Sequence, residues 1–179
     1  MTKERKVILY IAASLDGYIA KPNDDLSFLS FVEKEGEDYG YADFIKTVDT
    51  VILGRKTYDW IMKQVPEFVH GDKVTYVITR TKRPSIENTK FYTGDIKDLI
   101  NRLKREPGNN IFIDGGAQIV TELLKLKLID EFIISIIPVM VGDGIRLFQN
   151  QIPELYLKLH DVRHFDTGLV QLHYKHAGI

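Results

Sequence analysis

Short apolar runs rich in β-branched residues recur along the chain and alternate with stretches of helical periodicity. Residues 6–14, 50–53, 74–79 and 110–114 form such runs, each bounded by polar or turn-forming residues. We predict that they are strands. Strands that alternate with helices in this way are typical of an α/β fold with a mainly parallel sheet.

Three stretches between or after these runs carry helix signals. Residues 25–34 are predicted to form a helix with Asp25 as its N-cap. Residues 95–106 follow a second capping aspartate and end before a Pro-Gly pair, and residues 117–127 show the clearest amphipathic spacing. These helices would connect the parallel strands.

The pattern changes after residue 128. Residues 130–142 read as a long buried strand, and residues 155–176 as two strands joined at "DTG". We expect a C-terminal antiparallel hairpin that completes the same sheet, so that residues 1–179 form a single domain. The apolar strand is expected at the centre of the sheet, with a homodimer interface as the alternative.

Positive and negative charges nearly cancel, with 24 Lys and Arg against 25 Asp and Glu. This balance supplies no global field for nucleic acid or an anionic membrane surface, so neither is expected as a partner. The absence of cysteine excludes disulfides, thiolate catalysis and Cys-ligated zinc. The first apolar stretch is too short for a signal peptide or membrane span, which makes the cytoplasm the expected location.

Histidines gather near the C-terminus, where a metal site has to be considered. Four of the five, His160, His164, His173 and His176, fall within the predicted hairpin. They have no cysteine partner, no helical H-x-x-x-H spacing and no carboxylate at ligand spacing. We expect no metal there.

Three predicted strands end in residues suited to holding phosphate. Gly54, Arg55 and Thr57 follow the strand 50–53, where a glycine admits a close ligand and an arginine, a hydroxyl and helix N-terminal amides can bind an anion. An ordinary glycine turn is the alternative.

The second strand end is basic and the third is rich in glycine. Thr79 and Arg80 open the segment "TRTKR", either a clamp for a 2'-phosphate or a solvated loop. Gly115 and Gly116 follow the strand 110–114 and leave a peptide without a Cβ on either side at the start of a helix. Because ligands of open α/β sheets sit beyond the carboxyl ends of strands, the three together indicate a phosphorylated dinucleotide. The Rossmann fingerprint is absent, since "GDGIRL" at 142–147 has only its first two glycines.

The order of "IAASLDGYIA", "VILGRKTYDW", "VTYVITRT", "IFIDGGAQIVTELL" and "PVMVGDGIRLF" resembles the dihydrofolate reductase-like superfamily. The more similar branch is the reductase domain of bifunctional riboflavin-biosynthesis deaminase/reductases. The resemblance covers residues 7 to about 175 and implies a three-layer α/β/α fold and NADPH as cofactor. The residues that it places at the cofactor are Ala13, Leu15, Asp16, Gly54, Arg55, Thr57, Thr79, Arg80, Gly115, Gly116, Ala117 and Gln118.

The resemblance also implies a substrate side. Folate-reducing members carry an acid at the start of the first helix, which matches Asp25 as proton donor or water-positioning group, with a plain N-cap as the alternative. The neighbouring Leu26 and Leu29 would contact the substrate. Gly142 and Gly144 would border it, with a bulge at the end of a strand as their alternative.

The chain departs from both kinds of relative where they hold the substrate. The riboflavin branch grips a ribose phosphate with arginines and a histidine after the first helix, whereas residues 26–49 contain only Lys34 and Lys46 as cations. The arginine that holds the folate tail also has no clear match. We expect an NADPH-dependent reductase of a small, heterocyclic, pteridine- or pyrimidine-like molecule. The alternative is a non-catalytic NADP(H)- or ligand-binding protein with the same fold.

Overall fold

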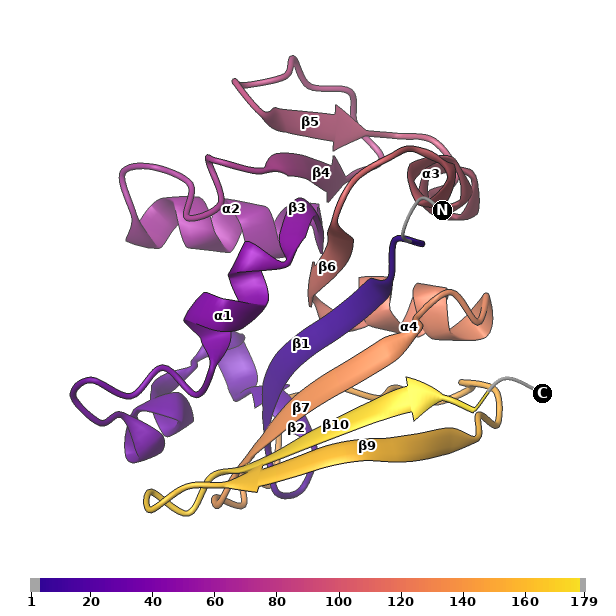
Figure 1. The fold of residues 1–179 in the computed structure, drawn as a ribbon. Coiled ribbons are helices and arrows are strands. Elements are labelled where there is room, and N and C mark those ends of the chain that lie inside the picture. The colour runs from indigo at the N-terminus through magenta and orange to yellow at the C-terminus, as the bar shows by residue number, and fades with distance from the viewer. Residues whose placement is uncertain (1–3, 178–179) are drawn as a thin grey trace.

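A mainly parallel sheet crosses the whole molecule in the computed structural model, which describes residues 4–177 (Figure 1). Within these residues, eight strands form one sheet in the order β5-β4-β3-β6-β1-β7-β10-β9, and β2 pairs with β8 in a small second sheet. The strands are β1 (Val7–Ser14), β2 (Tyr18–Ala20), β3 (Val48–Gly54), β4 (Val74–Ile78), β5 (Thr89–Tyr92), β6 (Asn110–Gly115), β7 (Glu131–Ile137), β8 (Ile145–Arg146), β9 (Leu157–His164) and β10 (Val170–His176). The strands from β5 to β7 in this order run parallel, and β9 and β10 form the antiparallel hairpin. The predicted fold class and hairpin are therefore confirmed.

Helices cover both faces of the sheet and make three layers. They are α1 (Tyr41–Lys46), α2 (Arg55–Gln64), α3 (Ile96–Arg105) and α4 (Ala117–Lys125), with two 3-10 turns, η1 (Pro22–Asp24) and η2 (Ser27–Val32). Apolar residues of α3 and α4 pack on one face of the sheet, and Phe44 of α1 and Tyr58 of α2 pack on the other. No helix in the described residues has the length and apolar character needed to cross a bilayer.

The register of the central strands brings three carboxyl ends to one edge of the sheet. Leu53 of β3 lies beside Gly115 of β6, and Gly54 lies beside Ile78 of β4. The residues that follow these strands are therefore neighbours in space, although they come from three separate parts of the chain.

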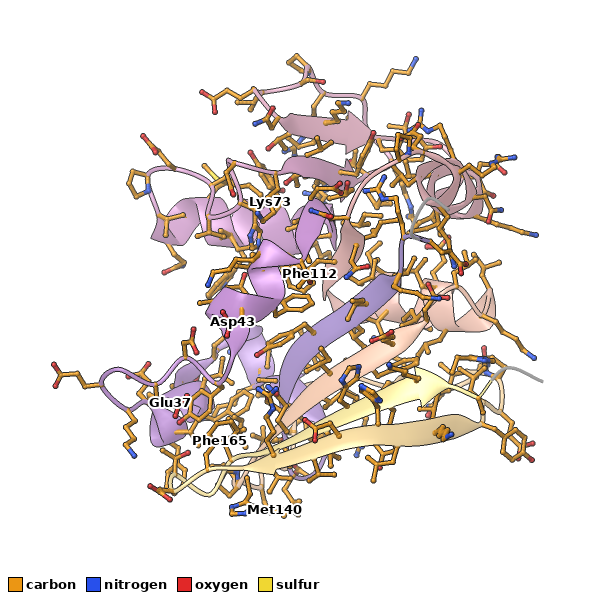
Figure 2. All side chains as sticks on the ribbon, in the orientation of Figure 1. Glu37, Asp43, Lys73, Phe112, Met140 and Phe165 are labelled. Atoms are coloured by element: carbon orange, nitrogen blue, oxygen red, sulfur yellow. The ribbon has the colours of Figure 1, made fainter. Side chains whose placement is uncertain are left out.

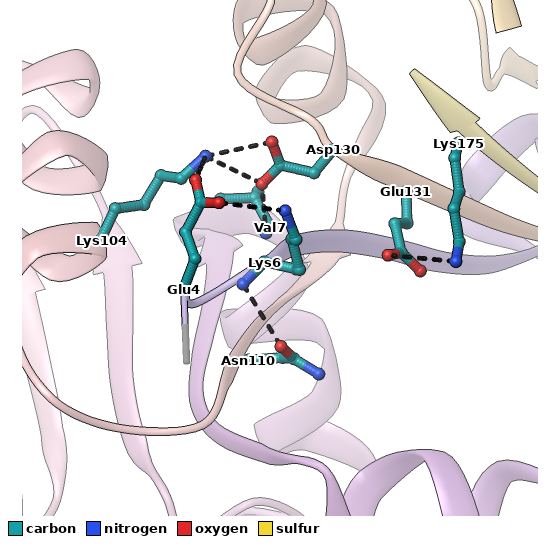
Figure 3. A network of polar contacts seen from close by, with 8 residues as sticks. All are labelled: Glu4, Lys6, Val7, Lys104, Asn110, Asp130, Glu131 and Lys175. Atoms are coloured by element: carbon teal, nitrogen blue, oxygen red, sulfur yellow. Dashed lines mark hydrogen bonds and ion pairs between the residues drawn. The ribbon is translucent and has the colours of Figure 1, made fainter. Parts of the chain in front are cut away.

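A polar network holds the opposite, amino-terminal edge (Figure 3). The N–H of Val7 donates to Asp130 Oδ2 at 2.8 Å, and Lys104 Nζ lies 3.0 Å from both oxygens of that carboxylate. The N–H of Lys6 donates to Asn110 Oδ1 at 3.3 Å. These bonds tie β1 to α3, β6 and the start of β7, and they leave the carboxyl ends open for function.

Two predicted elements are shorter than expected. The helix predicted over 25–34 is the 3-10 turn η2, of which only Phe28 and Val32 are buried. One turn is enough to bury this short apolar stretch, and the charged residues after it gain nothing from continuing the helix. The strand predicted over 130–142 ends at Ile137, because Pro138 lacks the N–H that a ladder requires.

Five short elements were not predicted: β5, α1, η1, and the pair β2 and β8. Each is six residues or fewer, too short for a periodic pattern to be recognised. β5 lies at the edge of the sheet beside β4. The paired strands β2 and β8 belong to loops that follow β1 and β7.

Asp16 joins those two loops. Its carboxylate accepts hydrogen bonds from Ser14 Oγ at 2.6 Å, from the N–H of Val141 at 3.0 Å and from the N–H of Gly142 at 2.7 Å. The hydroxyl of Ser14, followed by the N–H of Val141, lowers the pKa of Asp16 to about 2. The ionised form is therefore the one that holds the loops together.

We predict that Asp16→Asn lowers the melting temperature at neutral pH. Because the folded-state pKa is depressed, the contribution of Asp16 is present above the ordinary pKa near 4 and is lost as the pH falls towards 2. Thermal unfolding followed by circular dichroism should show a gap between wild type and variant that narrows from pH 5 to pH 3. The exposed Asp43→Asn is the matched control. A gap that does not change with pH would contradict this role.

Candidate functional site

The two glycine turns after β3 and β6 lie next to each other. A Cβ on Gly54 would lie 3.2 Å from Ile119 Cγ1 and 3.9 Å from the backbone nitrogen of Gly116. A Cβ on Gly116 would lie 3.0 Å from Thr57 Oγ1. The peptide between Gly115 and Gly116 is cis. The structure thus brings together the predicted phosphate-binding residues of two strand ends.

Two helices begin at this meeting point without a side-chain cap. Gly54 is the N-cap of α2 and Gly116 that of α4, and neither helix start is capped by a side-chain hydrogen bond. By contrast, α3 begins at Asp95, whose carboxylate accepts from the N–H groups of Lys97 and Asp98. The first N–H groups of α2 and α4 therefore point their partial positive charge at the same place, which suits an anion.

Cationic side chains surround the neighbouring strand end. Arg55 Nη1 lies 2.6 Å from Asp59 Oδ2, and Arg83 Nη1 lies 2.9 Å from the other oxygen of that carboxylate. Arg80 is exposed directly after the buried Thr79, whose hydroxyl accepts from the N–H of Thr81 at 3.2 Å. Asp59 thus balances two of the cations and leaves Arg80 to solvent.

The remaining residues predicted at the cofactor fall into two groups. Ala13 and Ala117 are buried, and Gln118 is exposed in the first turn of α4. Leu15 is exposed, and its N–H donates to Val139 O at 2.9 Å. Together with Asp16 it belongs to the loop after β1, and both residues bond to the loop after β7.

An open cavity of about 570 Å³ lies on the face of the sheet covered by η2 and α1. Strand residues and apolar side chains form its floor and walls: Tyr10, Ala12, Leu29, Val32, Tyr39, Tyr41, Ser135, Ile137 and Leu169. Its rim is formed by charged residues of the loop after η2: Glu33, Lys34, Glu35, Glu37 and Asp38. Figure 2 labels Glu37 on this loop, and Phe165, from the turn of the hairpin, packs edge-on against Tyr39 of the cavity wall. Ala12, near the end of β1, lines the cavity, and the next residue, Ala13, is one of those predicted at the cofactor. The cavity therefore lies near the carboxyl end of β1, the strand beside β6.

The hydrogen bonds of the cavity floor are satisfied internally. Gln171 Nε2 lies 3.1 Å from Ser135 Oγ and 3.2 Å from the hydroxyl of Tyr10. That hydroxyl donates to Tyr39 O at 3.1 Å. Burial raises the pKa of Tyr10, so the floor is neutral at physiological pH.

Of the residues predicted on the substrate side, Leu29 lines this cavity, whereas Leu26, Gly142 and Gly144 lie outside its lining. A Cβ on Gly144 would collide with the carbonyl of Ala20. Gly142 has φ +81° and its N–H donates to Asp16. The two glycines therefore serve the packing of the loops around β2.

Asp25 also lies outside the cavity lining, and its carboxylate is exposed. Its Oδ1 accepts the N–H of Ser27 at 2.7 Å at the start of η2. This bond lowers the pKa of Asp25 below its usual range. Asp25 thus holds the start of η2 by a side-chain bond, although the N-cap position itself is occupied by Leu26 and Asp25 ends η1. The direction of its pKa is opposite to that of an acid kept protonated for catalysis.

A buried pair beside the glycines was missed by sequence reasoning. His70 is 4% exposed, and its Nε2 lies 3.4 Å from Oδ2 of Asp114, the residue before Gly115. Asp114 also contributes to raising the pKa of Tyr41, which lines the cavity, after the larger effect of burial. The two residues are 44 positions apart (114 − 70), so only the fold shows that they meet. The signal in the sequence was the carboxylate directly before the glycine pair.

Comparisons with known proteins agree with this architecture. The family model described as "RibD C-terminal domain" matches residues 5–171. The uncharacterized protein YwjB of Bacillus subtilis strain 168 is 46% identical over 175 residues, which cover 97% of this chain and 99% of YwjB. A putative riboflavin biosynthesis protein from Shewanella sp. PV-4 has a crystal structure with a TM-score of 0.87 and 28% identity, over 97% of this chain and 99% of that one.

A more distant structure shows how widely the fold is shared. Dihydrofolate reductase from Enterococcus faecalis, complexed with NADP(H) and RAB-propyl, superposes with a TM-score of 0.66 at 15% identity. The match covers 99% of this chain and all of that one. With a family model over nearly the whole sequence and a dihydrofolate reductase-like architecture, the chain belongs to the RibD C-terminal domain family.

Proposed function

We propose that this protein is an NADPH-dependent reductase of a small heterocyclic substrate. The observation that carries the proposal is the meeting of two uncapped helix N-termini at Gly54 and Gly116, where any Cβ would fill the space. A diphosphate bound at this edge would meet N–H groups from both helices and the hydroxyl of Thr57. The substrate cavity begins one strand away, at Ala12.

The residues present fit the cofactor from one end to the other. Gly115, Gly116 and Thr57 would hold the diphosphate, and Arg80 would meet the 2'-phosphate of the adenosine. The nicotinamide would then lie towards Ala13, at the border between β1 and β6. When bound, NADPH supplies the hydride. The protein binds and orients both reactants and keeps water out of the apolar cavity.

We further infer that Asp114 is the carboxylate that serves the substrate during reduction. It is half-buried, adjoins Gly115, pairs with His70 and acts electrostatically on Tyr41 of the cavity. A nitrogen that receives a hydride on its neighbouring carbon also needs a proton, which the Asp114 and His70 pair could hold or position. Asp25 would then serve as the anchor of η2.

The first prediction concerns cofactor choice. Arg80→Ala should raise the Kd for NADPH about 10–100-fold, because a charge-assisted hydrogen bond is worth about 1.5–3 kcal/mol and 1.4 kcal/mol is tenfold. The Kd for NADH should not change, since NADH lacks the 2'-phosphate. Quenching of Trp60 fluorescence in α2 measures both constants.

Arg105→Ala, on an exposed arginine at the far end of α3, is the matched control. If wild type bound NADPH and NADH equally, or if Arg80→Ala weakened both alike, the proposed cofactor site would be wrong.

The second prediction separates the two carboxylates. Asp114→Asn should lower kcat by about 100-fold or more while NADPH binding is kept, because general acid-base assistance contributes about 10²–10⁴. Asp25→Asn should retain activity within about threefold, since Asn can still accept the N–H of Ser27. The activity of both variants is measured as the rate of NADPH oxidation with pteridine and pyrimidine substrates.

The pH dependence of kcat in His70→Gln is a further test of the pair, because a purely structural role of His70 would leave this pH dependence unchanged. Loss of activity in Asp25→Asn alone would reverse the assignment. NADPH binding without oxidation of any substrate tested would support the alternative, a non-catalytic NADP(H)-binding protein.

A further inference from the structure

The cavity beside β1 carries a strongly biased charge. Four of the five charged residues in its lining are acids, namely Glu33, Glu35, Glu37 and Asp38, and the fifth is Lys34. Lys34 Nζ lies 3.6 Å from a carboxylate outside the lining, that of Asp166, so its charge is already matched.

Two of the acids are fixed in place by the backbone. Asp38 accepts the N–H groups of Gly40 at 2.8 Å and Ala42 at 2.9 Å, and the bond from Ala42 is the main cause of its lowered pKa. Glu37 accepts the N–H of Tyr39 at 2.8 Å. Both carboxylates are therefore held on the loop that forms the rim.

The floor of the cavity carries no charge. It consists of the hydroxyls of Tyr10 and Ser135, and the amide of Gln171 behind them bonds to both. Arg163 of β9 is a cation beside this region: its guanidinium approaches Gly40, and its Nε lies 3.3 Å from the carboxylate of Asp161. Its positive charge is therefore balanced by an acid on its own strand.

The size of the cavity makes this imbalance matter for a bound molecule. A space of about 570 Å³ is comparable in width with the Debye length, which is about 8 Å at physiological ionic strength, so the rim charges are only partly screened. An anionic group entering the cavity meets repulsion from four acids, and the one cation of the lining, Lys34, already has Asp166 as a partner.

We propose that the cavity takes a small, neutral or cationic nitrogen heterocycle and excludes phosphorylated or carboxylated forms of it. The apolar walls would hold the ring, the neutral floor would face its hydrogen-bonding edge, and the acidic rim would set the charge. This inference rests on the proposed function in one respect, the assumption that the cavity is the substrate site. The substrate would then differ in charge from that of reductases whose substrate carries a ribose phosphate.

Two fluorescent probes with the same ring test the charge rule directly. 6-Methylpterin is neutral and pterin-6-carboxylate is an anion, and both can be titrated against the full chain by fluorescence anisotropy without NADPH. The neutral probe should bind at least about 10-fold more tightly at low salt, and the difference should shrink as salt is added.

Neutral variants of the rim supply the structural control. Glu33→Gln combined with Glu35→Gln should improve binding of pterin-6-carboxylate several-fold and leave 6-methylpterin nearly unchanged. The pair Glu106→Gln and Glu122→Gln, exposed acids on or beside α3 and α4, should change neither. Equal or tighter binding of the anion, no effect of the rim variants, or no binding of either probe at millimolar concentration would each overturn the proposal.

Two outcomes distinguish this inference from the proposed reductase. Binding of 6-methylpterin with no affinity for NADPH would leave the charge rule standing and remove the reductase. Oxidation of NADPH with cytidine 5'-monophosphate but not with cytidine would keep the reductase and overturn the charge rule.

Discussion

The close approach of β3 and β6 at their carboxyl ends is the constraint on which the candidate site depends. Leu53 lies beside Gly115 in the sheet, and the residues that follow on the two strands, Gly54 and Gly116, leave little space for a side chain. Any residue other than glycine at position 116 would press on Thr57. This contact aligns the starts of α2 and α4, and it leaves their N–H groups without the cap that α3 obtains from Asp95. Packing thereby creates an electropositive point in a chain whose net charge is nearly zero.

β1 separates this point from a cavity of the opposite character. On one side of the strand lie the glycine turn and the basic segment after β4; on the other lie an apolar pocket and an acidic rim. A molecule with an anionic end and a second molecule without one can therefore occupy neighbouring positions without competing. Asp114 lies directly before Gly115, and its Oδ2 is 3.4 Å from Nε2 of the buried His70. The polar network around Asp130 holds the far edge of the sheet, where it does not interfere with either region (Figure 3).

Much of the fold was predictable because strong local patterns coincide with long elements. The strand predicted over 6–14 is β1 (Val7–Ser14), and the helix predicted over 95–106 is α3 (Ile96–Arg105). The segment predicted over 25–34 was different, because its capping aspartate and apolar spacing are compatible with either a full helix or one 3-10 turn. Only packing against the sheet decides between them.

The cofactor side of the candidate site was easier to predict from the sequence than the cavity. Cofactor chemistry lies in short segments such as the glycine pair, whose meaning depends on a few adjacent residues. The cavity is assembled from β1, η2, β7 and a loop, so its charge could not be seen from any one segment. Gly142 and Asp16, both predicted to contact ligands, are bonded to each other. Spacing in sequence does not reveal that partnership, nor the contact between His70 and Asp114.

The most direct test of the central claim is a crystal structure of the protein soaked with NADPH. We expect the diphosphate against Gly115 and Gly116 at the start of α4, the 2'-phosphate beside Arg80, and the nicotinamide at the end of β1 facing the cavity. Density for the cofactor elsewhere on the molecule, or a diphosphate that does not contact Gly116, would contradict the account.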